Sequence, residues 1–538
     1  MSAISEKIRT VFPELAILKN EDTDRVFAGR NLPSFVKDYI IKRFSDKEGV
    51  IDLDAITDYL NTKMCINGGD IRRKLMDGQP VNLTCRFTVE SNLKDGRTWF
   101  RIAETELGTD AFILPSILEE HKDELVDGEN WGNITLEYVE PQGKKKGFVN
   151  MTSYRPFKPY TIDYSYFLNA RSEFTTEEWI DLIIAAMEYD PDSFGDHGTP
   201  ETLQMKLEFI SRLIIFVEPR LNMIELGPKG TGKSFVYSNL SKYVWLLGSG
   251  STTRARMFYN RATKQFGYLK GHDAVLIDEI STFEIGSRDG ELQSMLKGYL
   301  EAGKASVDGI TFQSECGLGL VGNINLSKDL KPTGNDYYKT LPGMFRESAT
   351  LDRFHAFIEG WKLPRLGMAN ILRGWTLNSE YFSEALHFLR TESAYESIFN
   401  QLVKTEEENP DIRDVKAVRR IATAYCKLLF PHISDVSVLS PEDLEQFKVM
   451  YRLYCLEPAV AKRAIIRAQC HMIDKEYSAE MPTFVMELSE PEYPIDTVDD
   501  GPMAPVEPEE PIETSEQEKP IDYFEPDEPE EVEDITES

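Results

Sequence analysis

The sequence has no apolar run long enough to cross a membrane, and no apolar segment at its start. A membrane-spanning helix needs about 20 consecutive apolar residues, whereas the best stretch, residues 209–217, is far shorter and contains Arg212. The first residues, Met-Ser-Ala-Ile-Ser-Glu-Lys, lack the apolar core of a secretory signal. We therefore expect a soluble, cytoplasmic protein that has no membrane partner.

The sequence also lacks the patterns that bind zinc or form disulfide frameworks. None of its six cysteines stands in a Cys-x-x-Cys pair, and none of its seven histidines stands in a His-Glu-x-x-His motif. Isolated cysteines in a chain large enough to bury its own core are typical of free thiols. We expect buried free thiols at Cys65, Cys85, Cys316, Cys426, Cys455 and Cys470.

The sequence has fewer basic than acidic residues, and most of this imbalance lies at the C-terminal end of the chain. The formal net charge is −31. Residues 487–538 contain 21 Asp or Glu and a single lysine, which leaves −11 for all preceding residues. Nine prolines and few apolar residues accompany these acids, so the segment cannot bury enough apolar surface to fold. We expect a disordered acidic tail that solubilises the protein, competes with DNA for a basic channel or recruits a basic partner.

The N-terminal part has the pattern of a small β-rich domain. Apolar residues alternate with polar ones from Val81 to Val89, as in a half-buried strand. The turn residues 94–96 then precede a second expected strand, residues 99–107. Residues 133–139 and 148–154 form another expected hairpin. We expect an α+β domain over residues 1–165 that contains a small barrel or sandwich.

The rest of the chain alternates strands and helices before it becomes mostly helical. Thr175 and Glu178 form an expected capping box at the start of a helix. Strand and helix signals alternate from residue 222 to residue 358, as a parallel sheet with crossover helices requires. The predicted fold class is α/β, with a helical connector (166–205), an α/β core (206–365), a helical lid (366–486) and the tail (487–538).

A glycine-rich loop between an expected strand and an expected helix carries the strongest functional signal. The loop consists of Gly227, Pro228, Lys229, Gly230, Thr231, Gly232, Lys233 and Ser234. Glycines let backbone N–H groups close around phosphates at a helix N-terminus, where the dipole favours anions. In this P-loop motif the lysine reaches the β and γ phosphates and the hydroxyl binds Mg²⁺. The sequence therefore predicts a site for ATP and Mg²⁺.

An acid pair follows the next apolar strand of the expected core. Residues 274–277 are apolar and are followed by Asp278 and Glu279. In P-loop enzymes an aspartate at this place holds Mg²⁺, and a neighbouring group activates the attacking water. We therefore expect Asp278 to bind the metal, together with Ser234, and Glu279 to act on the water.

The order of these motifs and two later residues resembles the AAA+ superfamily over residues 205–430. Asn323 ends another buried strand, and Arg353 stands in a Leu-Asp-Arg-Phe string. The resemblance implies that Asn323, with Asn325 as the alternative, orients the attacking water. It also implies that Arg353, with Arg346 as the alternative, completes the site of a neighbouring subunit as an arginine finger. The expected core is then an AAA+ core, and the protein an oligomer.

Two further segments are similar to minichromosome maintenance helicases. Residues 299–310 resemble the β-hairpin that touches DNA in those helicases, although this chain is shorter at the tip and has Asp308 there. Residues 413–424 resemble their lid helix. By that resemblance Arg420 is the sensor 2 arginine that acts on the nucleotide, with Arg413 as the alternative; a solvated arginine stays open as well.

Several longer strings resemble the BrxL family, the Lon-related AAA+ ATPases of BREX phage-defence systems. These strings are residues 174–182, 225–234, 258–260, 352–361 and 427–431. The resemblance implies a DNA-binding N-terminal domain, hexamers or stacked hexamers, and contact with other phage-defence proteins. Longer members carry a Lon-like domain after the lid, but only the acidic tail follows residue 486. We therefore expect a form without the protease domain and without proteolytic activity of its own.

Three functions follow as hypotheses. The first is a ring that binds double-stranded DNA and couples ATP hydrolysis to phage defence. Its candidate DNA contacts are the basic and aromatic residues 72–74, 144–146 and 154–158, which are equally compatible with solvated loops. The second is a Lon-related unfoldase that acts on protein, proteolytic only with a separate protease. The third, a scaffold that binds nucleotide without hydrolysis, is disfavoured by the intact acid pair.

Overall fold

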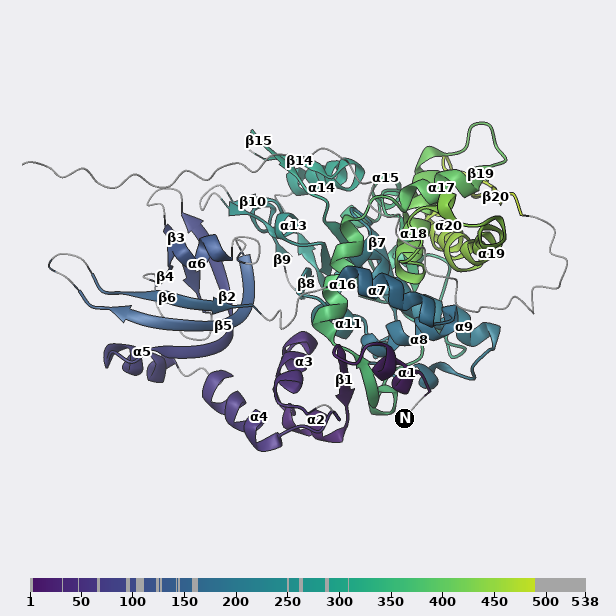
Figure 1. The fold of residues 1–538 in the computed structure, drawn as a ribbon. Helices are drawn as coiled ribbons and strands as arrows, with labels where there is room; N and C mark the ends of the chain where they lie inside the picture. The colour runs from purple at the N-terminus through teal and green to yellow at the C-terminus, as the bar shows by residue number, and fades with distance from the viewer. Residues whose placement is uncertain are drawn as a thin grey trace, which may run out of the picture.

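The protein has a small β-barrel at one end and a larger α/β body at the other (Figure 1). The computed structural model describes residues 3–30, 32–46, 48–64, 68–92, 97–102, 111–121, 125, 128–141, 143, 146–156, 163–248, 251–260, 265–285, 290–307 and 309–488. The acidic tail expected to be disordered lies almost entirely outside these residues. Among the described helices, none has the length and apolar character that a bilayer crossing demands.

The barrel is closed by five strands in the order β2-β3-β4-β6-β5. Alternate residues of β2 point inward, which confirms the predicted strand, and the predicted pairing of β5 with β6 is also confirmed. The predicted turn at residues 94–96 and the end of the second strand lie outside the described residues. The strands and attached helices are β2 (Val81–Asn92), β3 (Arg97–Arg101), β4 (Ala111–Ile113), β5 (Gly128–Val139), β6 (Phe148–Arg155), α5 (Gly68–Met76) and α6 (Pro115–Glu120).

The first residues of the chain pack on the large body rather than on the barrel. β1 (Ala16–Lys19) pairs with β18 (Gly374–Leu377), and the side chains of Ile8 and Phe12 are fully buried in the body's core. The expected N-terminal domain, residues 1–165, is thus divided between the two parts. Apolar residues on one face of α1 cause this, because they need a partner surface. The other elements here are α1 (Ala3–Val11), α2 (Glu21–Val26), α3 (Ser34–Arg43), α4 (Leu53–Tyr59) and η1 (Leu60–Met64).

A parallel five-stranded sheet forms the centre of the body, in the order β17-β7-β16-β12-β8. Its strands are near-continuous apolar runs because helices cover both faces, and the predicted alternation of strands and helices is confirmed. The strands are β7 (Met223–Gly227), β8 (Val244–Leu247), β12 (Ala274–Ile277), β16 (Gly317–Asn323) and β17 (Ala356–Glu359). Helices of this part include α9 (Pro200–Ile210), α10 (Ile214–Val217), α11 (Lys233–Asn239), α14 (Gly290–Ala302) and α15 (Ser348–Leu351).

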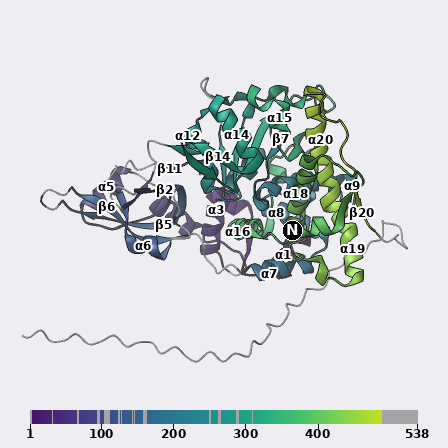
Figure 2. The ribbon, with the colours of Figure 1, turned by 90° about the horizontal axis from the view of Figure 1, so that it is seen from above.

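Helices follow the sheet, as predicted, and α17 to α20 gather at the end of the molecule opposite the barrel (Figures 1 and 2). The predicted capping box at Thr175 is present at the start of α8 (Thr176–Ala186). The later helices are α16 (Ser379–Thr391), α17 (Glu396–Leu402), α18 (Ile412–Leu429), α19 (Pro441–Tyr451) and α20 (Glu457–Ile473). A short pair of strands, β19 (Val403–Thr405) and β20 (Phe484–Met486), joins α17 to the end of the described chain.

The described cysteines and carboxylates give no sign of a zinc site. Cys85, Cys316, Cys426, Cys455 and Cys470 are buried free thiols, which confirms that expectation for the cysteines the structure describes. Within the described ranges, no three His, Cys, Asp or Glu side chains gather as metal ligands.

A buried histidine makes the stability of the body depend on pH. Burial lowers the pKa of His432 to about 3, and its Nδ1 atom has no hydrogen-bond partner. Because the unfolded chain binds a proton near pH 6.5 while the folded one does not, stability falls as pH drops below that value. Between pH 7.5 and 5.5, His432 should lower the free energy of unfolding by about 1.4 kcal/mol.

We expect His432→Phe to remove this contribution. The test is denaturant unfolding of the wild type and the variant at both pH values. A variant that loses as much stability on acidification as the wild type would show that His432 is not the group responsible.

Candidate functional site

The sequence-predicted site residues from three strands meet at one edge of the central sheet. β16 lies between β7 and β12, and all three strands run parallel. Their carboxyl ends therefore lie side by side: Gly227 pairs with Asn323, and Ile277 pairs with Leu320. After β7 the chain forms β8, β12 and β16, which all lie on one side of β7 in the sheet. It then forms β17 on the other side of β7. Ligands of open α/β sheets bind outside the carboxyl ends of strands at such a switch point.

The glycine-rich loop connects β7 to α11 with the backbone shape that its glycines permit. Gly230 and Gly232 have φ values of 84° and 76°, a region that only glycine occupies at no steric cost. Gly227 packs so closely that a Cβ there would lie 2.8 Å from the Cα atom of Gly360. The loop therefore needs glycine at these positions for its conformation and packing, as well as for phosphate access.

Lys233 begins α11 and folds back over the loop. Its Nζ atom donates to the carbonyl oxygens of Gly227 at 3.1 Å and Pro228 at 2.7 Å, and lies 3.5 Å from Asn323 Oδ1. Burial lowers the pKa of Lys233. The structure thus brings together the predicted lysine and Asn323, while Asn325, the alternative, accepts a hydrogen bond from Thr333 through its carbonyl oxygen.

Ser234 and the acid pair lie on the other side of the loop. The Ser234 hydroxyl donates to Asp278 Oδ2 at 2.6 Å, and Asp278 Oδ1 accepts the backbone N–H of Glu279 at 2.8 Å. Oxygen donors of this kind suit Mg²⁺, so the donor set fits the predicted metal. Glu279 is exposed and has a φ of 48°, a conformation that costs a non-glycine residue about 1–3 kcal/mol and clusters at functional sites.

A buried ion pair beneath the loop was not predicted from the sequence. Arg212 Nη2 lies 2.6 Å from Glu225 Oε1, both side chains are fully buried, and the Tyr237 hydroxyl donates to Glu225 Oε2 at 2.7 Å. Glu225 lies in β7 and Tyr237 in α11, so this group clamps the two elements that hold the loop. The available signals were an arginine inside an apolar helix and a glutamate inside an apolar strand.

Arg353 lies at the opposite end of the sheet from the glycine-rich loop of its own chain. It precedes β17, and its carbonyl oxygen accepts a hydrogen bond from the side chain of Asn222, the residue before β7. Its guanidinium forms an ion pair with Glu301, Nε to Oε2 at 2.8 Å. Such a position agrees with an arginine that serves another subunit, and that role stays a prediction. Arg346, the alternative, is exposed, whereas Arg353 is half-buried.

Arg420 lies beside the segment that leads into β7, and its predicted sensor 2 role stays a prediction. Its guanidinium donates to the carbonyl oxygen of Pro219 and lies 3.7 Å from Glu218 Oε1, both at the start of the segment that leads into β7. Pro219 and Glu218 precede the amino end of β7, so Arg420 lies away from the glycine-rich loop of its own chain. Burial lowers the pKa of Arg420, against the attraction of Glu218. Arg413, the alternative, shares the carboxylate of Glu301 with Arg353.

The basic groups predicted in the N-terminal part have different environments. Arg72, Arg73 and Lys74 are exposed on α5, whereas Lys144 and Lys145 lie outside the described residues. Tyr154 is buried in the barrel, where its ring packs edge-on against Phe87, so it is unavailable as a DNA contact.

An aromatic cluster on the outside of the barrel was also not predicted. The rings of Trp99 and Phe112 lie 4.5 Å apart, and those of Phe112 and Phe148 lie 5.5 Å apart. The Arg97 guanidinium covers Phe112 at 4.7 Å. The cluster joins β3, β4 and β6, which are far apart in the sequence, so no local pattern predicts it.

The sheet order and the residues at its carboxyl edge define an α/β protein with a glycine-rich loop at the switch point of a parallel sheet. Residues 149–483 match the family model described as "Lon-like protease BrxL-like, ATPase domain". Residues 10–138 match the model "BREX system Lon protease-like protein BrxL N-terminal". The chain therefore belongs to the BrxL family, as the sequence resemblance predicted.

Two curated relatives share most of this chain. A protein named Lon-like protease BrxL from Escherichia coli O9:H4 (strain HS) is 27% identical over 421 residues, covering 77% of this chain and 59% of the relative. Another of that name from Bacillus cereus (strain H3081.97) is 24% identical over 438 residues, covering 80% and 62%. The chain thus spans about three fifths of the length of these relatives.

Proposed function

We propose that this protein is an AAA+ ATPase that assembles into a ring, binds DNA and couples ATP hydrolysis to phage defence within a BREX system. The observation that carries the proposal is the meeting of Lys233, Ser234, Asp278 and Asn323 at one sheet edge. The family's name supports the link to BREX.

The proposed chemistry divides among the chain's own residues. The N–H groups of the glycine-rich loop and Lys233 hold phosphates, and in doing so replace the lysine's hydrogen bonds to Gly227 and Pro228. Ser234 and Asp278 hold Mg²⁺, which supplies charge neutralisation when bound. Glu279 and Asn323 orient and activate water on the exposed side. In this proposal Arg353 acts on the nucleotide of a neighbouring subunit, which is why a ring is required.

The barrel is the proposed DNA contact. Five strands closed as a Greek key are the architecture of OB folds, whose second and third strands and adjacent loops bind oligonucleotides. Here those strands are β3 and β4, which carry Trp99, Phe112 and Arg97. Aromatic rings beside a guanidinium suit base stacking and phosphate contact.

We expect Arg97→Ala and Phe148→Ala to weaken binding of DNA by about 5-fold to 100-fold, the range found for loss of a stacking platform. Fluorescence anisotropy with single-stranded and double-stranded oligonucleotides measures this at fixed salt. Arg25→Ala, which removes an exposed arginine from α2, is the control and should change affinity little. Equal effects of all three variants would argue for non-specific charge attraction instead of this surface.

The alternative is a Lon-related unfoldase that acts on protein, as the relatives' printed name suggests. Stimulation of ATP hydrolysis by duplex DNA but not by an unfolded protein supports the DNA proposal, and the reverse result supports the alternative.

Electron microscopy with ATP and duplex DNA tests the ring directly: particles that enclose the duplex are expected, and monomers with ATP and DNA bound would contradict the proposal.

A further inference from the structure

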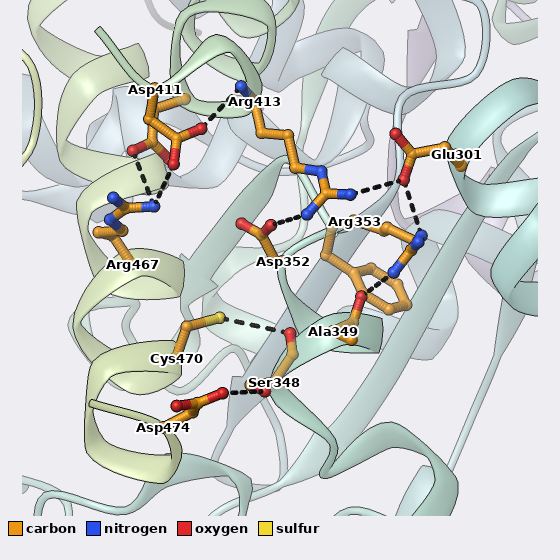
Figure 3. A network of polar contacts seen from close by, with 12 residues as sticks. Glu301, Ser348, Ala349, Asp352, Arg353, Asp411, Arg413, Arg467, Cys470 and Asp474 are labelled. Atoms are coloured by element: carbon orange, nitrogen blue, oxygen red, sulfur yellow. Dashed lines mark hydrogen bonds and ion pairs between the residues drawn. The ribbon is translucent and has the colours of Figure 1, made fainter. Parts of the chain in front are cut away.

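A network of ion pairs surrounds Arg353 and joins four helices (Figure 3). It links the end of α14, the segment after α15, the start of α18 and one face of α20. Its ion pairs differ in burial. The buried pairs form a fixed part, and the partly exposed pairs, in which one partner can replace another, form an exchangeable part.

The fixed part holds the backbone beneath Arg353. Asp352 Oδ1 lies 2.5 Å from Arg463 Nη2, and both side chains are almost completely buried. Arg463 also reaches Asp414 at 2.7 Å. Just after the end of α20, Asp474 accepts a hydrogen bond from the hydroxyl of Ser348 at 3.3 Å. α15 and the residues after it are therefore anchored to α20, so the Arg353 side chain starts from a rigid base.

The exchangeable part is the carboxylate of Glu301. Its Oε2 atom lies 2.8 Å from Arg353 Nε and 3.3 Å from Arg413 Nη2. The Glu301 side chain is 47% exposed and that of Arg353 is 19% exposed, so water competes for this contact. Arg413 also binds Asp352 at 2.7 Å. If Arg353 leaves, Arg413 still neutralises Glu301, and the exchange leaves no unpaired carboxylate.

Glu301 also lies close to the base of the β-hairpin, so its position depends on that of the hairpin. It lies in the last turn of α14, just before Gly303 and the strands β14 (Lys304–Val307) and β15 (Ile310–Gln313). Gly303 has a φ of 68°, and a Cβ there would lie 2.6 Å from Arg220 Cδ. The root of the hairpin is thus tightly packed, so a displacement of the hairpin moves the end of α14.

We propose that Glu301 is a positioning residue that holds Arg353 away from the neighbouring subunit until the hairpin is displaced. In this state Arg353 is paired within its own chain. A shift of α14 withdraws Glu301 and frees the guanidinium for the neighbour's phosphates. This inference rests on the proposed ATPase function and adds a control of its rate by the hairpin.

The test is Glu301→Gln in the full chain. The amide keeps the size of the side chain but removes the charge that attracts Arg353. We expect the basal kcat for ATP hydrolysis to rise about 3-fold or more, since a released arginine acts on the transition state, with little change in KM. We take duplex DNA within the ring as the agent that displaces the hairpin, so the stimulation of ATP hydrolysis by DNA should shrink correspondingly. Combining Glu301→Gln with Arg353→Ala should abolish the gain.

Glu347→Gln is the matched control. Glu347 is 48% exposed and pairs with Lys297, which lies in α14 like Glu301. Among the described residues, no contact links Glu347 to Arg353 or Arg413. Its kcat should match the wild type. Wild-type protein without ATP hydrolysis would contradict the proposed function itself. An active wild type with an unchanged or lower basal kcat in Glu301→Gln would overturn the proposed hold of Glu301 on Arg353. Undiminished stimulation of this variant by DNA would overturn the proposed control of that hold by the hairpin.

Discussion

Replacing Glu279 with Gln is expected to lower kcat for ATP hydrolysis by about 100-fold or more while nucleotide binding is retained. A positioned general base contributes about 10²–10⁴ to a rate, and the amide cannot accept the proton. Binding should survive because Glu279 is exposed and does not contact the glycine-rich loop groups Lys233 and Ser234 in the described structure. Steady-state phosphate release and titration with a fluorescent ATP analogue measure the two quantities separately.

Lys233→Ala should behave differently, because it removes a group that we propose contacts the phosphates themselves. We expect both binding and hydrolysis to be lost. Glu359→Gln is the control: Glu359 also ends a strand at the carboxyl edge of the sheet, but pairs with Lys362. If Glu279→Gln and Lys233→Ala left ATP turnover and protection of cells from phage unchanged, the proposed function would have to be abandoned.

The sequence was sufficient for the features that local spacing determines. Alternation along β2, the capping box of α8 and the loop from Gly227 to Ser234 each depend on residues close together in the chain. The meeting of Asn323 with Lys233 could also be predicted, because parallel strands end at a common edge. In each case, hydrophobic period or backbone geometry restricts the structure before any tertiary contact forms.

Long-range packing decides what the sequence could not predict. Arg420 occupies a helix position that resembles a phosphate-contacting arginine, yet the packing of α18 against α10 and α20 places it beside Pro219. The first residues pack on the body because Phe12 finds its apolar partners there, more than 150 residues away in sequence, among them Phe174. The ion-pair partner of Arg353 is Glu301, at the end of α14. None of these contacts leaves a periodic signal.

The second large effect should come from the buried ion pair beneath the glycine-rich loop. Arg212→Ala leaves Glu225 in a fully buried site with only the Tyr237 hydroxyl as partner. Breaking a buried pair in this way costs about 3–5 kcal/mol, which for a body of this size lowers Tm by roughly 5 °C. Because Glu225 and Tyr237 join β7 to α11, we also expect the loop to lose its affinity for nucleotide.

A triple replacement separates stability from charge. Arg212→Met, Glu225→Leu and Tyr237→Phe together remove the buried charges and the hydroxyl while keeping the volume, and such exchanges are often neutral or stabilising. Thermal unfolding followed by circular dichroism should therefore show a large loss of Tm for Arg212→Ala and recovery in the triple variant. Arg73→Ala, at a site 72% exposed, should leave Tm unchanged. A triple variant as unstable as the single one would contradict this account. It would mean that the ion pair itself holds β7 against α11, and that an unpaired Glu225 is not the cause of the loss.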